Sequence, residues 1–162
     1  MLTRVALGAG AALLSTVAPR AGRAAGTAEA LLLSCMDYRL IDDIVRYMDG
    51  RGLRDRYDHV ILAGASLGAL QDRNVAWGQT FWDHVDVALR LHHIGRVIVM
   101  DHRDCGAYAA FLGPDHARNA DSEFQAHATR MRALREMILA RHPALAVELL
   151  FMALDGTVET VA

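Results

Sequence analysis

Two short segments of this chain contain side chains that could hold a metal ion. Residues 35–39 read Cys-Met-Asp-Tyr-Arg, and residues 102–106 read His-Arg-Asp-Cys-Gly. Cys35 and Cys105 are the only cysteines of the chain, and each segment follows a hydrophobic run. Two thiolates and an imidazole supply three of the ligands of a tetrahedral zinc site and leave one position open. We therefore expect Cys35, His102 and Cys105 to bind Zn²⁺.

Asp37 and Arg39 stand close to the first candidate ligand. Zinc lowers the pKa of a bound water to about 7, which supplies hydroxide at neutral pH. Asp37 can accept a hydrogen bond from that water or can itself occupy the fourth zinc position. Arg39 can hold the Asp37 carboxylate through two parallel hydrogen bonds, and such a partner decides which role the carboxylate takes. This set of groups indicates metal-activated water chemistry rather than a purely structural metal.

Each of these residues also has a simpler interpretation when it is taken alone. Cysteine is often a small buried apolar residue. Asp37 can cap the helix that follows it, and His102 can be a turn residue. A disulfide between Cys35 and Cys105 is a further alternative. These interpretations do not explain why every candidate ligand falls at the end of an expected strand.

Hydrophobic patterns predict an alternation of strands and helices. Apolar runs predict four buried strands, at residues 30–36, 59–65, 96–100 and 145–153. Helical spacing predicts helices at residues 40–48, 77–93, 106–112 and 122–141. The first is expected to end at Gly50 or Gly52, the second at Gly95 and the third at Gly113. A loop is expected at residues 66–74, and a turn at Asp155-Gly156.

This alternation predicts an α/β fold, with a mostly parallel sheet of four to five strands flanked by helices and joined by right-handed crossovers. Ligands of such sheets bind at the carboxyl ends of the strands. Cys35 follows the first strand, and His102 and Cys105 follow the third. We therefore expect both segments to meet at one edge of the sheet.

Composition limits the classes of protein to be considered. The 162 residues suffice for one domain with a hydrophobic core and are too few for two comfortable ones. An apolar content of 53% excludes a disordered chain. The net charge is −2 and no basic block is present, so nucleic acid is not an expected partner. Two cysteines are too few for a disulfide framework.

Residues 1–24 have the features of a secretory signal. Arg4 precedes a soft apolar run at residues 5–18, and Gly-Arg-Ala at residues 22–24 forms a small-x-small cleavage site. The run is too short for a stable membrane span. We expect residues 25–162 to form a single zinc-binding domain of an exported, periplasmic or secreted bacterial protein. The alternative is an N-terminal helix that packs on the domain or on a partner subunit of a cytoplasmic protein.

The paired motifs resemble those of a known enzyme family. Cys-x-Asp-x-Arg followed by His-x-x-Cys-Gly, set in an α/β chain, is similar to the β-class carbonic anhydrases. The likeness extends from about Leu31 to Val158. The ending Leu-Asp-Gly-Thr-Val, after an apolar strand, also resembles the last strand and hairpin turn of that family. The two motifs together are fairly specific, whereas either alone would be weak.

This resemblance implies an activity and a role for each residue. It implies zinc bound by Cys35, His102 and Cys105, with Asp37 and Arg39 as the catalytic dyad. The implied enzyme is a carbonate dehydratase, a lyase that reversibly hydrates CO₂ to bicarbonate through a zinc-bound hydroxide. In a closed form that some members adopt, Asp37 takes the fourth zinc position. Members usually assemble as dimers or larger homo-oligomers.

One segment departs from the family pattern and keeps other functions open. Members usually carry Arg-Asn-Ala-Gly after the second strand, whereas residues 62–68 read Leu-Ala-Gly-Ala-Ser-Leu-Gly. One alternative is a hydrolase of a CO₂ analogue such as carbonyl sulfide or carbon disulfide. Another is a non-catalytic zinc-binding or sensor domain with Asp37 on the metal. A third is a secreted domain stapled by a Cys35–Cys105 disulfide.

The other polar candidates are expected to be structural. Neighbouring helix positions point about 100° apart, so His92 and His93 are interpreted as helix-end caps rather than a second metal pair. Ser66 does not lie in a nucleophile elbow. Tyr108 and Phe111 are expected in the core. Surface or packing roles are expected for the remaining histidines, which are His59, His84, His116, His127 and His142.

Overall fold

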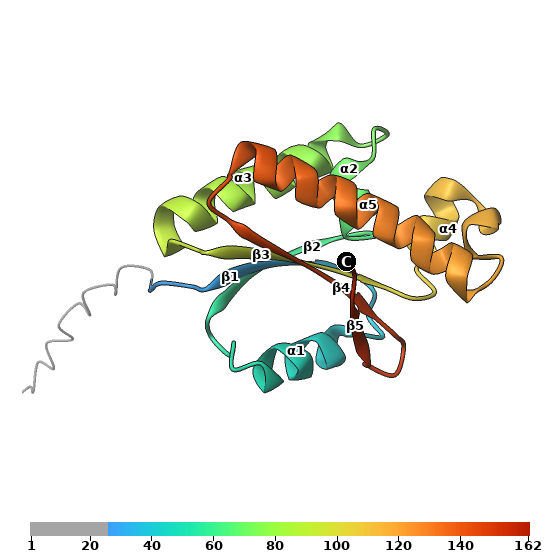
Figure 1. Cartoon of the computed structure of the whole chain (residues 1–162), viewed down its shortest axis with the longest axis horizontal. Coiled ribbons are helices and arrows are strands. Elements are labelled where there is room, and N and C mark those ends of the chain that lie inside the picture. The colour runs from blue at the N-terminus through green and yellow to red at the C-terminus, as the bar shows by residue number, and fades with distance from the viewer. Residues whose placement is uncertain (1–25) are drawn as a thin grey trace, which may run out of the picture.

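The computed structural model describes residues 26–162, so the signal segment expected at residues 1–24 lies outside the described residues. The described chain forms one sheet with helices on both faces (Figure 1). Its strands are β1 (Ala30–Cys35), β2 (Tyr57–Leu62), β3 (Arg96–His102), β4 (Ala146–Met152) and β5 (Val158–Thr160). Its helices are α1 (Ile41–Gly50), α2 (Ser66–Leu70), α3 (Val75–His92), α4 (Gly106–Leu112), the 3₁₀ helix η1 (Pro114–Ala117) and α5 (Ala120–Arg141).

The strand order β2-β1-β3-β4-β5 determines which chain segments meet. The first four strands are parallel, and β5 runs antiparallel to β4 after the turn at Asp155-Gly156. This arrangement confirms the predicted α/β fold with its mostly parallel sheet. Because β1 and β3 are paired neighbours, with Ser34 opposite Met100, their carboxyl ends lie side by side.

The sheet separates two hydrophobic layers. Helix α1 covers one face, while α2, α3 and α5 cover the other (Figure 1). On the α1 face, Ile44 and Met48 pack against side chains of β1 and β3. On the opposite face, Phe81 of α3 and Leu134 of α5 belong to a larger cluster. Since β1 and β3 are covered on both faces, they are the continuous apolar runs expected of central parallel strands.

The structure corrects several boundaries of the sequence prediction. The predicted strand at residues 59–65 begins earlier and ends earlier, as β2. The helix predicted at residues 77–93 begins at Val75 and ends at His92, and His93 takes the left-handed position there instead of Gly95. His102 is the last residue of β3 rather than a residue after it. These shifts are small, because the apolar pattern determines the middle of an element better than its ends.

The predicted loop at residues 66–74 was wrong in its first half, which forms helix α2. Two contacts explain this short helix. The buried carboxylate of Asp101 accepts a hydrogen bond from the Ser66 N–H at 3.0 Å and so caps the first turn. Gly68 lets the helix approach the preceding chain, since a Cβ there would lie 2.6 Å from the Ala63 carbonyl oxygen. The first contact joins segments 35 residues apart, so local sequence patterns do not reveal it.

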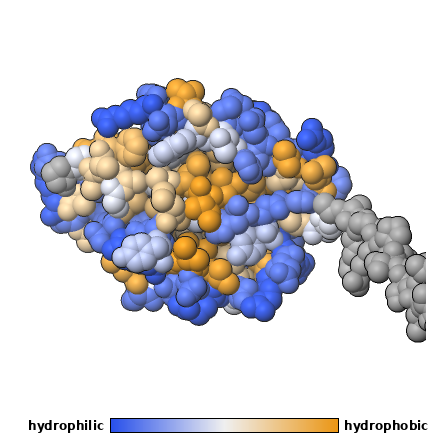
Figure 2. Space-filling view, turned by 180° about the vertical axis from the view of Figure 1, so that it is seen from behind, coloured by the Kyte–Doolittle hydropathy of each residue, from blue (hydrophilic) through white to orange (hydrophobic). Residues whose placement is uncertain are grey.

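Apolar side chains gather on the face opposite to that seen in Figure 1, and Figure 2 shows them bordered by hydrophilic residues. Exposed large apolar side chains include Met36, Ile41, Val45 and Ile61. Among residues 26–162, no helix is both long enough and apolar enough to span a lipid bilayer.

Candidate metal centre

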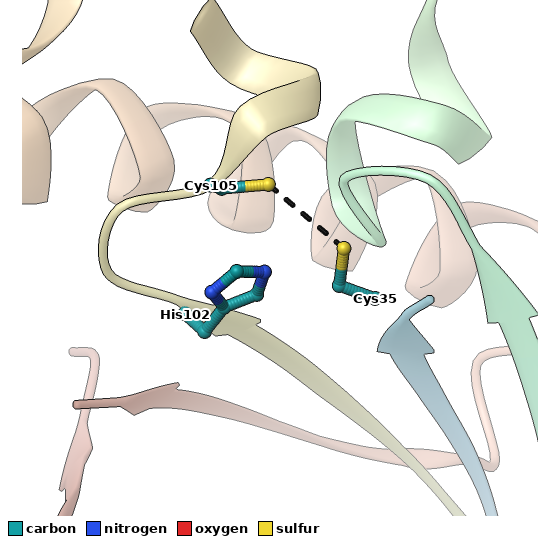
Figure 3. Close-up of side chains that lie close together, drawn as sticks. All are labelled: Cys35, His102 and Cys105. Carbon is teal, nitrogen blue, oxygen red and sulfur yellow. Dashed lines mark hydrogen bonds between the residues drawn. The ribbon is translucent and has the colours of Figure 1, made fainter. Parts of the chain in front are cut away.

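Three candidate ligands converge at the carboxyl ends of β1 and β3. Cys35 is the last residue of β1, His102 is the last residue of β3, and Cys105 immediately precedes α4 (Figure 3). Their ligand atoms all lie within 4.8 Å of one another, and the two sulfur atoms are 3.9 Å apart. All three residues are buried. One ion could therefore contact all three side chains.

The imidazole of His102 is oriented by its own chain. Nδ1 lies 2.7 Å from the Arg103 carbonyl oxygen, so Nδ1–H donates that bond and Nε2 keeps its lone pair. Nε2 is buried and has no hydrogen-bond partner among the described residues. A buried acceptor without a partner is costly in an ordinary core, whereas it is what a metal ligand requires.

The surroundings of Cys35 favour its thiolate. The Cys105 thiol next to it holds the pKa of Cys35 below the usual range, with further contributions from His102 and the Gly64 N–H. Gly64 N lies 3.3 Å from the Cys35 sulfur. Burial alone would lower the pKa of His102, but the neighbouring Cys35 thiolate raises it above the ordinary value. The low pKa of Cys35 favours the thiolate form that a metal ion binds, and a metal would take the place of the proton on His102.

The donor set fits a small, borderline-soft cation. Two sulfur ligands and one imidazole match sites that hold Zn²⁺, whereas Mg²⁺ and Ca²⁺ prefer oxygen. The two cysteines are free thiols and no disulfide joins them. The alternative of a Cys35–Cys105 staple is thus not the arrangement in this structure.

Asp37 and Arg39 form a tight ion pair beside the three ligands. The guanidinium donates from Nε to Asp37 Oδ1 at 2.9 Å and from Nη2 to Oδ2 at 2.7 Å. The Arg39 backbone N–H also donates to Oδ1, at 3.0 Å. Hydrogen bonding to Arg39 lowers the pKa of Asp37 to about 2. Its Oδ2 lies 3.9 Å from His102 Nε2, so a permanently ionised carboxylate borders the ligand cluster.

A pocket of about 590 Å³ opens over this pair. Its lining includes Cys35 and the charged side chains of Asp37, Arg39 and Asp104. Much of the remaining wall is apolar, and it includes Met36, Ala63, Ala107 and Phe111. The arrangement can thus bring a small apolar molecule to the edge of the ligand cluster.

Sequence reasoning missed Asp104 as a partner of Arg39. Its carboxylate accepts a hydrogen bond from Arg39 Nη1 at 2.8 Å, and its carbonyl oxygen accepts one from Nη2 at 2.9 Å. Asp104 stood within the motif segment, but its reach depends on a left-handed backbone turn with a φ of 54°. That conformation could not be read from the residue types.

Sequence reasoning also missed a buried network centred on Asp101. Its carboxylate accepts hydrogen bonds from the Ser66 N–H, the Ser66 hydroxyl at 2.6 Å, the Tyr108 hydroxyl at 2.7 Å and His127 Nδ1 at 2.9 Å. All four residues are at most 3% exposed. The available signal was Asp101 itself, since a charged residue inside an apolar strand must find partners.

The other polar candidates have partners away from the cluster. His92 Nδ1 lies 2.7 Å from a carboxylate oxygen of Asp58, so it hydrogen-bonds to another element instead of only capping its helix. His59 Nε2 lies 2.7 Å from the Ser34 hydroxyl. Tyr108 is fully buried, as expected, whereas Phe111 is only partly buried.

Comparisons with known proteins agree with this geometry. A family model described as "Putative carbonic anhydrase" matches residues 26–162. An uncharacterized protein of Rickettsia conorii is 39% identical over 134 residues, which cover 83% of this chain and 72% of the relative. One of Rickettsia bellii is 37% identical and covers 83% and 82%.

Solved structures with a similar fold include carbonic anhydrases. The carbonic anhydrase of Streptococcus mutans superposes with a TM-score of 0.55 at 16% identity, over 84% of each chain. A tetrameric β-carbonic anhydrase of Sordaria macrospora gives 0.53 at 13% identity, over 85% of this chain and 82% of its own. These likenesses show the fold and confirm the resemblance to the β class. Since the family model spans all the described residues, the chain belongs to this carbonic anhydrase family.

Proposed function

We propose that the protein is a zinc-dependent carbonic anhydrase that reversibly hydrates CO₂ to bicarbonate. The observation that supports this most is the buried convergence of two sulfur atoms and an unpartnered imidazole nitrogen next to a carboxylate. A purely structural zinc site usually has four protein ligands, whereas three protein ligands with an adjacent open pocket are typical of catalytic sites.

Each residue of the centre has a distinct task in this proposal. Cys35, His102 and Cys105 would hold Zn²⁺, which when bound lowers the pKa of a water molecule enough to supply a nucleophile at neutral pH. Asp37 stays ionised, because its pKa is about 2, and accepts a hydrogen bond from the nucleophile to orient it. Arg39 fixes the plane of the Asp37 carboxylate through its two parallel bonds.

The pocket wall supports a small apolar substrate. Ala63, Ala107 and Phe111 offer no charge to a neutral molecule such as CO₂. From the segment that departs from the family pattern, apolar Ala63 lines this wall, while Ser66 is fully buried and bonds to Asp101. The absence of the usual Arg-Asn pair is therefore compatible with CO₂ as substrate.

Stopped-flow CO₂ hydration on protein of confirmed zinc content tests the proposal. We expect fast turnover that rises with pH and is lost after removal of zinc by a chelator. Restored activity on adding Zn²⁺ back distinguishes loss of the metal from damage to the protein.

Absent turnover at full zinc occupancy would contradict the proposal. The same protein would then be assayed with carbonyl sulfide and carbon disulfide, since the apolar wall admits them equally. If these substrates are also inert, a zinc-binding or sensor role remains.

We further propose that the domain self-associates and that the N-terminal segment directs export. Exposed Met36 and Ile61 are large apolar side chains that a second copy could cover, and the Sordaria macrospora relatives are described as tetrameric. Light scattering on the purified protein measures the assembly. Cell fractionation followed by N-terminal sequencing of the mature chain tests export, and a cytoplasmic protein starting at Met1 would contradict it.

A further inference from the structure

We propose that Asp104 is a positioning residue that holds Arg39 in place and thereby keeps Asp37 off the metal. This inference rests on the proposed metal centre and adds a third member to the Asp37–Arg39 pair. It concerns the balance between two roles of Asp37, which can accept a hydrogen bond at the site or can itself become a metal ligand.

The turn that carries Asp104 is fixed from a distant helix. Glu123, at the start of α5, accepts a hydrogen bond from the Asp104 N–H at 2.5 Å and lies 3.3 Å from Arg103 Nη1. Glu123 itself is buried. Asp104 has a φ of 54°, which non-glycine residues adopt rarely and aspartate more readily than most. The backbone that carries the Asp104 carboxylate is therefore held by α5, independently of Arg39.

The Arg39 guanidinium donates hydrogen bonds to both Asp37 and Asp104. Asp37 accepts hydrogen bonds from Nε and Nη2. Asp104 accepts one from Nη1 with its carboxylate and one from Nη2 with its carbonyl oxygen. The Arg39 side chain is 36% exposed, so without a second anchor its long stem would sample several rotamers. Asp104 removes that freedom before Asp37 binds and presents the guanidinium in the plane of the Asp37 carboxylate.

These contacts limit how far the Asp37 carboxylate can move towards the metal site. Its Oδ2 is already 3.9 Å from His102 Nε2, so a modest rotation would bring it to a shared metal. That rotation breaks two charge-assisted bonds, unless Arg39 can move with Asp37. Because Asp104 anchors the far side of Arg39, the guanidinium cannot follow. Loss of the Asp104 carboxylate should therefore shift Asp37 towards the metal.

The test measures access to the metal rather than turnover. Wild-type protein and the variants Asp104→Asn and Asp104→Gly are loaded with Co²⁺ and titrated with thiocyanate, followed by visible absorption. Asparagine and glycine both tolerate the left-handed backbone, so the turn keeps its shape. Each protein is compared with its own Asp37→Ala version, in which no carboxylate can close the site. This comparison also subtracts any general effect of the lost charge on anion binding.

We expect the ratio of closed to open sites to rise about threefold to fivefold in both Asp104 variants, the size expected for one exposed ion pair. In the Asp37→Ala background, the Asp104 substitutions should change thiocyanate binding only by the general effect of the lost charge. Asp115→Asn, which removes an exposed partner of Arg118 elsewhere, serves as the matched control and should behave as wild type.

Three results would overturn the inference, and they are distinguishable. If cobalt binds with thiolate-to-metal absorption but the Asp104 variants keep the wild-type ratio, Asp104 does not position Asp37 through Arg39. If cobalt-loaded wild-type protein shows no thiolate-to-metal absorption, the proposed metal centre is contradicted, and so is the role of Asp104 that rests on it. A change in thiocyanate binding that is equally large in the Asp37→Ala background would also contradict it, since the effect would then not depend on Asp37.

Discussion

Asp101 and Asp104 stand three residues apart on either side of His102, yet their carboxylates meet opposite surroundings. The Asp101 carboxylate is 1% exposed and accepts four hydrogen bonds from Ser66, Tyr108 and His127. The Asp104 side chain is 71% exposed and binds one guanidinium. The same residue type thus serves an interior network and a surface ion pair within a single turn of chain.

The difference separates stability from chemistry. A buried carboxylate has lost its water and must be satisfied by the protein, so its partners are tied to the folded state. The hydrogen bonds of Asp101 join α2, α4 and α5 to the end of β3, and so they stabilise the elements around His102 and Cys105. An exposed carboxylate keeps most of its water and contributes little to folding, but it can still orient a neighbour. Substitutions at the two positions should therefore affect different measurements.

The largest expected effect is loss of stability in Asp101→Ala. The substitution leaves the Ser66 N–H, two hydroxyl groups and His127 Nδ1 without their acceptor in a dry interior. We expect the free energy of unfolding to fall by about 4 kcal/mol, the cost of breaking a buried charged network. Urea denaturation followed by circular dichroism measures it. Asp104→Asn, which tolerates the left-handed backbone at this position, is the control and should unfold close to wild type. Equal losses in the two variants would contradict the proposed distinction.

The second effect is on activity and concerns Asp37→Ala. If Asp37 orients the nucleophile, CO₂ hydration should fall about 100-fold, at the lower end of what a positioned acid or base contributes. Zinc content should stay at the wild-type level, because all three ligands remain. Stopped-flow assays paired with metal analysis check both, with Asp115→Asn as an exposed aspartate control. Undiminished turnover would remove Asp37 from the chemistry.

The contrast between the two aspartates also marks what the sequence could predict. The strands follow from continuous apolar runs, and the strand order then brings Cys35 and His102 to one sheet edge. Their expected proximity needed only the βαβ rule, because chirality and connection length leave few alternatives. The roles assigned to the three ligands, Asp37 and Arg39 remain predictions.

The rest depends on contacts between distant segments. Ser66, Asp101, Tyr108 and His127 belong to four separate elements and follow no common spacing, so no local pattern connects them. Helix α2 was mistaken for a loop because its first N–H is capped by Asp101, which lies 35 residues away. Asp104 was overlooked because its direction follows from one left-handed φ angle. Packing and backbone handedness supply this information, and residue types alone do not.

A smaller effect isolates one bond of the buried network. Tyr108→Phe removes the hydroxyl that donates to Asp101 and lies 3.0 Å from the Ser66 hydroxyl, while the ring keeps its stacking on His127. We expect the free energy of unfolding to fall by about 1 kcal/mol, the usual net value of one hydrogen bond. Chemical denaturation against wild type measures it. A loss as large as that of Asp101→Ala would mean that the network depends on the hydroxyl rather than on the carboxylate.

The last effect, of similar size, is the pH dependence of stability that the same hydroxyl causes. Burial, and then the adjacent Asp101 charge, raise the pKa of Tyr108 well above its ordinary value of 10.0. Above pH 10 the unfolded chain therefore releases this proton while the folded chain keeps it, so stability falls as pH rises. Between pH 10 and 11 wild type should lose about 1 kcal/mol more than Tyr108→Phe. If the free energy of unfolding falls equally steeply with pH in the two proteins, the Tyr108 hydroxyl ionises as it does in water. That result would contradict its place in the buried network.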